Sequence, residues 1–216
     1  MSFNKCWQYE VPTKTSQMVW RSLGEGEVFV TREGGKPFIL ASGQPATLKA
    51  DAERLFAKRK LRQRLLGIYS VHPCVVEADA LSFAPNGMAG FAEALRKKLK
   101  KPIIRLFRPE GAPRTDIRYV DEEEDIRLTQ EVGSVCVLED VSTSGFSAHE
   151  AARVLFSANP DLEIHTLSML QRDEVKEDYQ TGPGAIVYHT FVRQDLPLDV
   201  AGFKDRFPEI PVLVVP

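Results

Sequence analysis

Two adjacent acidic residues stand at the end of an apolar stretch, directly before a loop rich in hydroxyl groups. The stretch 134–140 (SVCVLED) ends in Glu139 and Asp140, and the loop after it leads into an amphipathic run at 147–158. Ligands of open parallel sheets bind beyond the carboxyl ends of the strands. Hydroxyls and free N–H groups at the start of a helix suit a phosphate, whose charge the helix dipole favours. The pattern therefore predicts a phosphate site beside two carboxylates.

The acid pair narrows the choice of ligand. Two carboxylates would repel a phosphate unless they face other groups, and a ribose hydroxyl pair or a hydrated Mg²⁺ would give them that role. A simple helix cap at Ser147 would explain neither the acid pair nor the run of hydroxyls. The loop lacks the Gly-Lys-Ser/Thr sequence of a Walker loop. We therefore expect a sugar phosphate that binds together with magnesium.

Strands and helices that alternate from about residue 70 onward place this loop in an α/β domain with a mainly parallel central sheet flanked by helices. The uninterrupted apolar run at 134–140 is typical of a strand covered on both faces. Apolar residues at helical spacing predict helices at 50–66 and 147–158, and a loop leading into a helix at 83–101. Further strands are expected at 73–81, 102–107, 163–171, 185–191 and 211–215.

The first part of the chain does not follow this alternation. Residues 27–43 predict two short strands around a Gly-Gly turn. We expect one domain over 1–216, in which a small N-terminal hood with its helix (about 1–66) covers an α/β core (about 67–216). Residues 108–132 contain prolines, a glycine and the acidic run DEEED without a clean period. A connection of that length is usually functional or disordered, so a mobile loop is expected there.

Composition and charge exclude several classes of function. A formal net charge of -2 argues against a protein that wraps nucleic acid or an anionic membrane, and no apolar run has membrane-spanning length. The three cysteines, Cys6, Cys74 and Cys136, are widely spaced, which indicates free thiols in a reducing compartment and a cytoplasmic location. The four histidines are isolated in the sequence, so no transition-metal site is expected.

The segment VLEDVSTSGFS (137–147) resembles the signature with which type I phosphoribosyltransferases bind phosphoribosyl pyrophosphate (PRPP). The resemblance implies that fold, with Mg²⁺ held through PRPP rather than directly by the protein. It also implies that Glu139 and Asp140 bind the ribose hydroxyls and that they contact the magnesium ion through water. The 5-phosphate would bind to the loop made of Ser142, Thr143, Ser144, Gly145, Phe146 and Ser147. Phe146 departs from the family, where a small residue is usual.

Other segments are similar to orotate phosphoribosyltransferase in particular. Residues 37–51 (PFILASGQPATLKAD) resemble its N-terminal stretch, which implies that Ser42 and Gly43 contact the base. Residues 84–95 resemble its pyrophosphate loop, which implies a role for Asn86 and Gly87. Residues 166–174 and 185–196 resemble its closing strands, where Arg172 would contact the orotate carboxylate.

The cations of the expected mobile loop depart from the family pattern. The family's loop supplies a lysine to the pyrophosphate of a neighbouring subunit, whereas this chain has no lysine between Lys101 and Lys176. Arginine can neutralise pyrophosphate oxygens with bidentate geometry. We therefore expect Arg105 and Arg108 to bind PRPP and Arg114 to assist catalysis.

The expected function is transfer of ribose 5-phosphate from PRPP to a nucleobase, with orotate favoured, in pyrimidine nucleotide synthesis. The resemblance also implies a homodimer, and neither nucleic acid nor a membrane is expected as a partner. Ala41, where the family often has a lysine, and the changed residues near Lys49 favour another base as one alternative. The missing loop lysine favours a second alternative, a non-catalytic regulatory protein that binds PRPP or a nucleotide.

Overall fold

A computed structural model describes residues 13–39, 45–85, 87–142, 144–172, 186–194 and 196–216. Its central sheet has four parallel strands in the order β10-β9-β8-β5. The strands are β5 (Ala80–Phe83), β8 (Ser134–Ser142), β9 (Glu163–Gln171) and β10 (Ile186–Arg193). The expected α/β class and parallel sheet are therefore confirmed.

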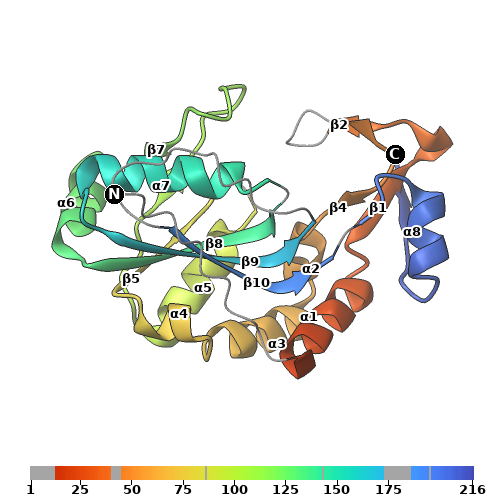
Figure 1. Cartoon of the computed structure of the whole chain (residues 1–216), viewed down its shortest axis with the longest axis horizontal. Coiled ribbons are helices and arrows are strands. Elements are labelled where there is room, and N and C mark those ends of the chain that lie inside the picture. The colour runs from red at the N-terminus through yellow and green to blue at the C-terminus, as the bar shows by residue number, and fades with distance from the viewer. Residues whose placement is uncertain (1–12, 40–44, 86, 143, 173–185, 195) are drawn as a thin grey trace, which may run out of the picture.

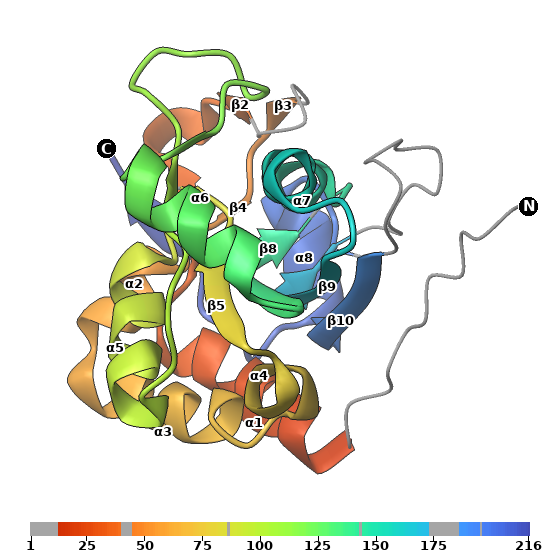
Figure 2. The ribbon, with the colours of Figure 1, turned by 90° about the vertical axis from the view of Figure 1, so that its left-hand side faces the viewer.

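Helices cover both faces of this sheet (Figures 1 and 2). One face carries α6 (Glu122–Glu131) and α7 (Phe146–Ala158), and the other carries α1 (Thr13–Glu25), α3 (Arg59–Tyr69), α4 (Pro73–Glu77) and α5 (Ala89–Leu99). Successive residues of β8 enter different cores, because strand side chains alternate between faces. Val135 and Val137 pack with α7, while Cys136 and Leu138 pack in the core on the opposite face. This double burial explains the continuous apolar run of β8.

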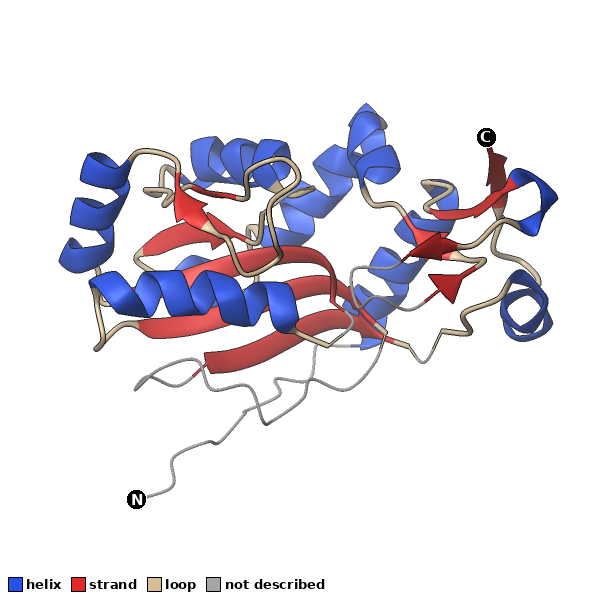
Figure 3. Ribbon diagram, turned by 90° about the horizontal axis from the view of Figure 1, so that it is seen from above, coloured by secondary structure: helices blue, strands red, loops and turns tan. Residues whose placement is uncertain are grey.

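A smaller lobe stands beside the carboxyl edge of the sheet (Figures 1 and 3). Its three-stranded sheet has the order β11-β1-β4, formed by β1 (Phe29–Arg32), β4 (Lys49–Ala50) and β11 (Leu213–Val215). The C-terminal helix α8 (Val200–Arg206) joins this lobe, where the rings of Phe29 and Phe203 lie 4.7 Å apart. The lobe thus combines strands from residues 29–50 with α8 and β11 from residues 200–215.

The first predicted hairpin is not formed. Strand β1 leads into a short 3₁₀ helix (Glu33–Gly35), and the next strand, β2 (Phe38–Ile39), pairs with β3 (Pro45–Ala46) in a separate ribbon. The predicted helix at 50–66 is interrupted: Lys58 has an extended backbone and separates α2 (Glu53–Ala57) from α3.

Two more local predictions are wrong. Residues 73–81 begin as helix α4 and not as a strand, because Pro73 occupies its first turn, where the missing N–H costs nothing. At 102–107 only Leu106–Phe107 (β6) form a strand, which pairs with β7 (Arg118–Tyr119).

The acidic run lies in a helix rather than in a mobile loop. The side chain of Asp121 accepts a hydrogen bond from the N–H of Glu124 and caps α6. Four acids then occupy the first turn, where the helix dipole favours negative charge. Across the described residues, no helix combines the length and the apolar character needed to cross a membrane.

Candidate functional site

Two neighbouring cavities lie where the carboxyl ends of the central strands meet the small lobe. Their volumes are about 370 and 360 Å³, and Lys49, Glu139, Asp140 and Ser147 are among the residues that line both. The first cavity extends toward Arg114 and Arg172, and the second toward Gly87 and Arg108. The structure therefore brings together most of the described residues that the sequence singled out.

Of the two acids of β8, which line both cavities, Glu139 is buried and Asp140 is half-buried. Glu139 is 6% exposed, and desolvation together with the charge of Asp140 raises the pKa of Glu139 to about 8. Burial also raises the pKa of Asp140, although Val141 donates its N–H to the Asp140 carboxylate at 2.7 Å. Buried carboxylates are stabilised by donors or cations close to them. The pair is thus suited to hydroxyl groups and to a hydrated cation.

The loop before α5 approaches Asp140 so closely that only glycine fits. Gly87 has a φ of +113°, and a Cβ built on it would lie 2.7 Å from Oδ2 of Asp140. The backbone of this loop therefore borders the second cavity directly beside the acid pair. Asn86, the other predicted residue of this loop, lies outside the described residues.

The hydroxyl-rich loop leads into α7 as predicted. Gly145 has a φ of +76° at the N-cap of α7, a backbone conformation that favours glycine. Gly145, Phe146 and Ser147 line the first cavity, so the N-terminus of α7 faces it. Ser142 is a buried end residue of β8, Ser144 follows in the turn, and Thr143 lies outside the described residues.

The arginines of the segment between α5 and α6 lie in different places. Arg114 donates from Nη2 to Oγ of Ser147 at 3.4 Å, and its guanidinium lies 4.6 Å from the ring centroid of Phe146. Arg108 lines the second cavity. Arg105 instead forms ion pairs with Glu93 and Glu124, and it is not among the residues that line either cavity.

Two further cations, Lys49 and Arg172, line the first cavity. Arg172 follows β9, is 5% exposed, and donates to the carbonyl groups of Leu196 and Pro197. Lys49 in β4 lines both cavities, yet sequence reasoning treated it only as a departure from the family. Its position two residues before Asp51, in the segment 37–51 that resembles a base-binding stretch, was the available signal. Ser42 and Gly43 lie outside the described residues.

Solved structures that share this fold include phosphoribosyltransferases. Orotate phosphoribosyltransferase from Aeropyrum pernix matches with a TM-score of 0.58 and 16% identity, over 87% of this chain and 97% of that one. UMP synthase from Leishmania donovani matches with a TM-score of 0.55 and 14% identity, over 90% of this chain and 38% of that one. An adenine phosphoribosyltransferase matches with a TM-score of 0.53 and 14% identity, over 78% of this chain and 98% of that one. No family model and no curated protein matches the sequence.

These likenesses concern the fold. The chain has the phosphoribosyltransferase fold, which confirms the resemblance first seen in residues 137–147. Both orotate and adenine enzymes share it, so the fold leaves the choice of base to the side chains of the site.

Proposed function

We propose that this protein is a phosphoribosyltransferase that uses PRPP and releases pyrophosphate. The observation that carries the proposal is the convergence of three elements on the shared cavities: the acid pair of β8, the glycine loop before α5, and the N-terminus of α7. Each element offers the chemistry that one part of PRPP needs, and the glycine loop lies beside the other two although Gly87 is about 50 positions before the acid pair in the sequence.

The side chains would act mainly by placement and by charge stabilisation. Glu139 and Asp140 accept hydrogen bonds from the ribose hydroxyls, and the positive charge that develops on the ribose ring is stabilised by these carboxylates. The N–H groups and hydroxyls at the start of α7 hold the 5-phosphate. Arg108 and Arg114 neutralise the leaving pyrophosphate, beside which Gly87 lets the backbone approach.

The site also fits magnesium, the cofactor expected with PRPP. Its donors near the acid pair are carboxylate oxygens, which Mg²⁺ prefers, and burial raises the pKa values of Glu139 and Asp140, so a cation beside them would stabilise their charged forms. When bound with PRPP, magnesium would neutralise pyrophosphate oxygens, and Glu139 and Asp140 would orient its water ligands.

Orotate is the base that the cavity supports best. Arg172 and Lys49 give the first cavity two cations in addition to Arg114. An anionic base such as orotate gains from such charges, whereas adenine carries no charge for them to neutralise. We therefore assign Arg172 to the base carboxylate and add Lys49 as a second base-side cation. Transfer to orotate would place the protein in pyrimidine nucleotide synthesis.

A homodimer is also part of the proposal. The resemblance implies a homodimer in which a loop cation serves the neighbouring subunit, whereas Arg114 contacts Ser147 of its own chain. The described residues thus supply a loop cation without help from a partner. Dimerisation is tested by sedimentation equilibrium, and a chain that stays monomeric at micromolar concentration would contradict it.

A regulatory protein that binds PRPP without turnover remains the alternative. Arginine cannot donate a proton at neutral pH, and every cation lining the two cavities near α7 except Lys49 is an arginine. Such a protein would keep the affinity for PRPP and lack the reaction.

The test is pyrophosphate release from PRPP and Mg²⁺, with orotate, uracil and purine bases supplied separately. Release with orotate supports the assigned base, and release with another base keeps the reaction but reassigns the cavity. No pyrophosphate release with any base, combined with a PRPP-induced rise in melting temperature, supports the regulatory alternative. No release and no rise in melting temperature contradict the proposed function.

A further inference from the structure

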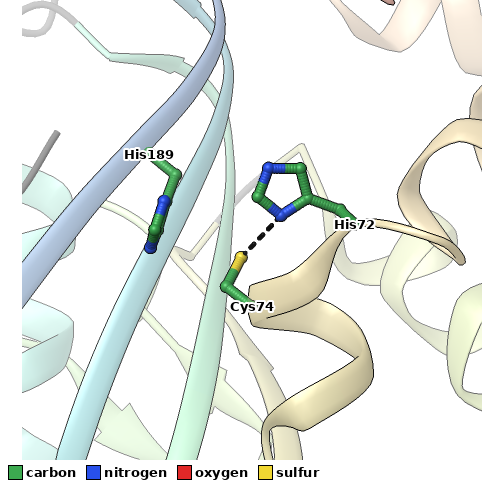
Figure 4. Close-up of side chains that lie close together, drawn as sticks. All are labelled: His72, Cys74 and His189. Carbon is green, nitrogen blue, oxygen red and sulfur yellow. Dashed lines mark hydrogen bonds between the residues drawn. The ribbon is translucent and has the colours of Figure 1, made fainter. Parts of the chain in front are cut away.

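Three side chains from two distant parts of the sequence meet on the sheet face that α1, α3, α4 and α5 cover. His72 and Cys74 stand at the start of α4, and His189 lies in β10. Figure 4 shows their side chains gathered between the helix and the strand. A ligating atom from each of the three lies within 4.8 Å of the others, and Nδ1 of His72 lies 3.0 Å from Sγ of Cys74. Sequence reasoning treated these histidines as isolated, and the structure corrects that.

The fold brings these residues together for local reasons. His72 is the N-cap of α4 and Pro73 starts the helix, so both ligating side chains leave the same helix end. The ring of His72 packs edge-on against Phe191 and His189, with centroids 5.2 and 5.6 Å apart. Phe191 and His189 point to the same side of β10, since they are two residues apart in the strand.

A chain of hydrogen bonds next to the cluster is compatible with a metal-binding nitrogen on His189. Nε2 of His165 donates to a carboxylate oxygen of Glu163 at 2.8 Å. Nδ1 of His165 lies 3.1 Å from Nε2 of His189, and in the tautomer in which His189 donates this bond, its Nδ1 carries the lone pair. Histidines that bind metals commonly donate their other N–H to an acceptor in this manner.

We propose that His72, Cys74 and His189 bind one divalent transition-metal ion, with Zn²⁺ as the natural occupant. Two imidazole nitrogens and a thiolate are ligands that zinc favours, whereas Mg²⁺ prefers oxygen. Zn–N bonds of about 2.0–2.1 Å and Zn–S bonds of about 2.3 Å put neighbouring tetrahedral ligand atoms about 3.3–3.8 Å apart. The observed spacing, 3.0 Å for the closest pair and at most 4.8 Å, brackets that range. Small side-chain rotations would complete the site.

The ion would join α4 to β10 and serve the structure rather than the transfer reaction. Cys136, whose Sγ lies 3.7 Å from that of Cys74, precedes Asp140 by four residues on β8. Four residues of strand span about 13 Å, so the metal site lies well away from the acid pair. Binding releases the thiol proton of Cys74 to solvent, because the thiolate is the ligand.

Co²⁺ absorption tests the site directly, since a thiolate ligand gives Co²⁺ a near-ultraviolet charge-transfer band. The probe is Co²⁺ alone, titrated into the full chain with Cys6→Ser, which removes the third thiol, after treatment with a chelator. We expect saturation at one ion per chain, a thiolate band, and displacement by Zn²⁺. In the same background, Cys74→Ser should abolish the band and Cys136→Ser should keep it. Absence of saturable binding, or a thiolate band that survives Cys74→Ser, would overturn the proposal.

A second measurement covers the case in which Cys74→Ser fails to fold. The melting temperature of the Cys6→Ser chain is compared without metal, with Zn²⁺ and with Mg²⁺. Zn²⁺ at about a hundredfold excess over its dissociation constant should raise it by about 5–10 °C, because the ion binds only the folded chain. Mg²⁺ should leave it unchanged. Equal shifts with both ions, or none with Zn²⁺, would refute the site.

Discussion

The guanidinium of Arg114 lies 4.6 Å from the centroid of the Phe146 ring and 3.4 Å from Oγ of Ser147. Phe146 is one departure from the family pattern, and the missing loop lysine is another. We propose that this contact links the two departures, with the aromatic residue supporting an arginine that takes the place of the lysine. The first turn of α7 contacts Arg114 beside the loop to which we assign the 5-phosphate.

We predict that Phe146→Ala weakens PRPP use by about two- to fivefold in kcat/KM, the range of an exposed cation–π contact. Arg114→Ala should cost more, about 10- to 100-fold, because a charge-assisted hydrogen bond to an anion is lost. Arg118→Ala is the matched control, since Arg118 pairs with Asp116 on the same segment. Steady-state kinetics with varied PRPP measures all three. An Arg118→Ala loss as large as that of Arg114→Ala would contradict a specific role for Arg114.

Gly87→Ala should disable the site while the fold persists. The new Cβ would lie 2.7 Å from Oδ2 of Asp140, in a backbone conformation that disfavours alanine, so the carboxylate must move. A displaced catalytic group commonly costs about 100-fold in rate. Gly90→Ala in α5 is the control, because a Cβ there meets no atom within 4 Å.

The pair is compared by kcat/KM and by melting temperature. Gly90→Ala should keep activity and gain about 0.5–1 kcal/mol in stability, as alanine favours helices over glycine. If Gly87→Ala retained activity equal to that of Gly90→Ala, the close approach to Asp140 would have no functional meaning.

The free energy of unfolding of the unliganded chain should fall as pH rises, because the buried carboxyl group of Glu139 becomes ionised. Its pKa is about 8 in the folded chain and near 4.5 when exposed. The stabilisation is therefore fully present below pH 4.5 and is lost as pH rises to about 8. Glu139→Gln removes this loss. At pH 8 we expect the free energy of unfolding of the variant to exceed that of the wild type by about 3–5 kcal/mol, and below pH 4.5 the two should follow the same pH trend. Urea denaturation across this pH range measures the difference.

The control for this experiment is Glu131→Gln, which breaks a surface ion pair with Arg127. Exposed pairs contribute about 0–1 kcal/mol, so its stability should follow that of the wild type at every pH. Parallel curves for the wild type and Glu139→Gln would show that burial does not raise the pKa of Glu139.

Lys49→Met should impair use of the base more than use of PRPP. Removing one cation from the base side of the first cavity should raise the KM for orotate by about tenfold, the effect of about 1.4 kcal/mol, and change the KM for PRPP little. Lys36→Met, on the exposed surface of the small lobe, is the matched control. An equal rise in both KM values would contradict the assignment of Lys49 to the base and favour a contact with the phosphates of PRPP.

Local signals predicted the centre of the fold well. The sequence predicted the positions of β8, the turn at Gly145 and α7 within about two residues. Burial on both faces and helical spacing produce patterns among neighbouring residues, so they can be recognised locally. The prediction of a strand at 73–81 was wrong because a short apolar run is compatible with either a helix or a strand. Pro73 favours the start of a helix there.

Non-local contacts could not be predicted in the same way. The C-terminal strand β11 pairs with β1 almost two hundred residues away, so nothing near Leu213 identifies its partner. His72, Cys74 and His189 likewise meet only because α4 packs on β10. The cation Lys49 was missed for a similar reason, since the small lobe places it over the acid pair.

The central claim is that Glu139 and Asp140 form the binding site for PRPP. Calorimetric titration of PRPP with Mg²⁺ into the wild type and into Asp140→Asn tests it most directly, because the substitution keeps the size of the side chain and removes its charge. We expect measurable binding by the wild type and an affinity at least about tenfold lower for Asp140→Asn, the loss expected for a hydrogen bond to a charged group. Equal affinities, or no binding by the wild type, would contradict it.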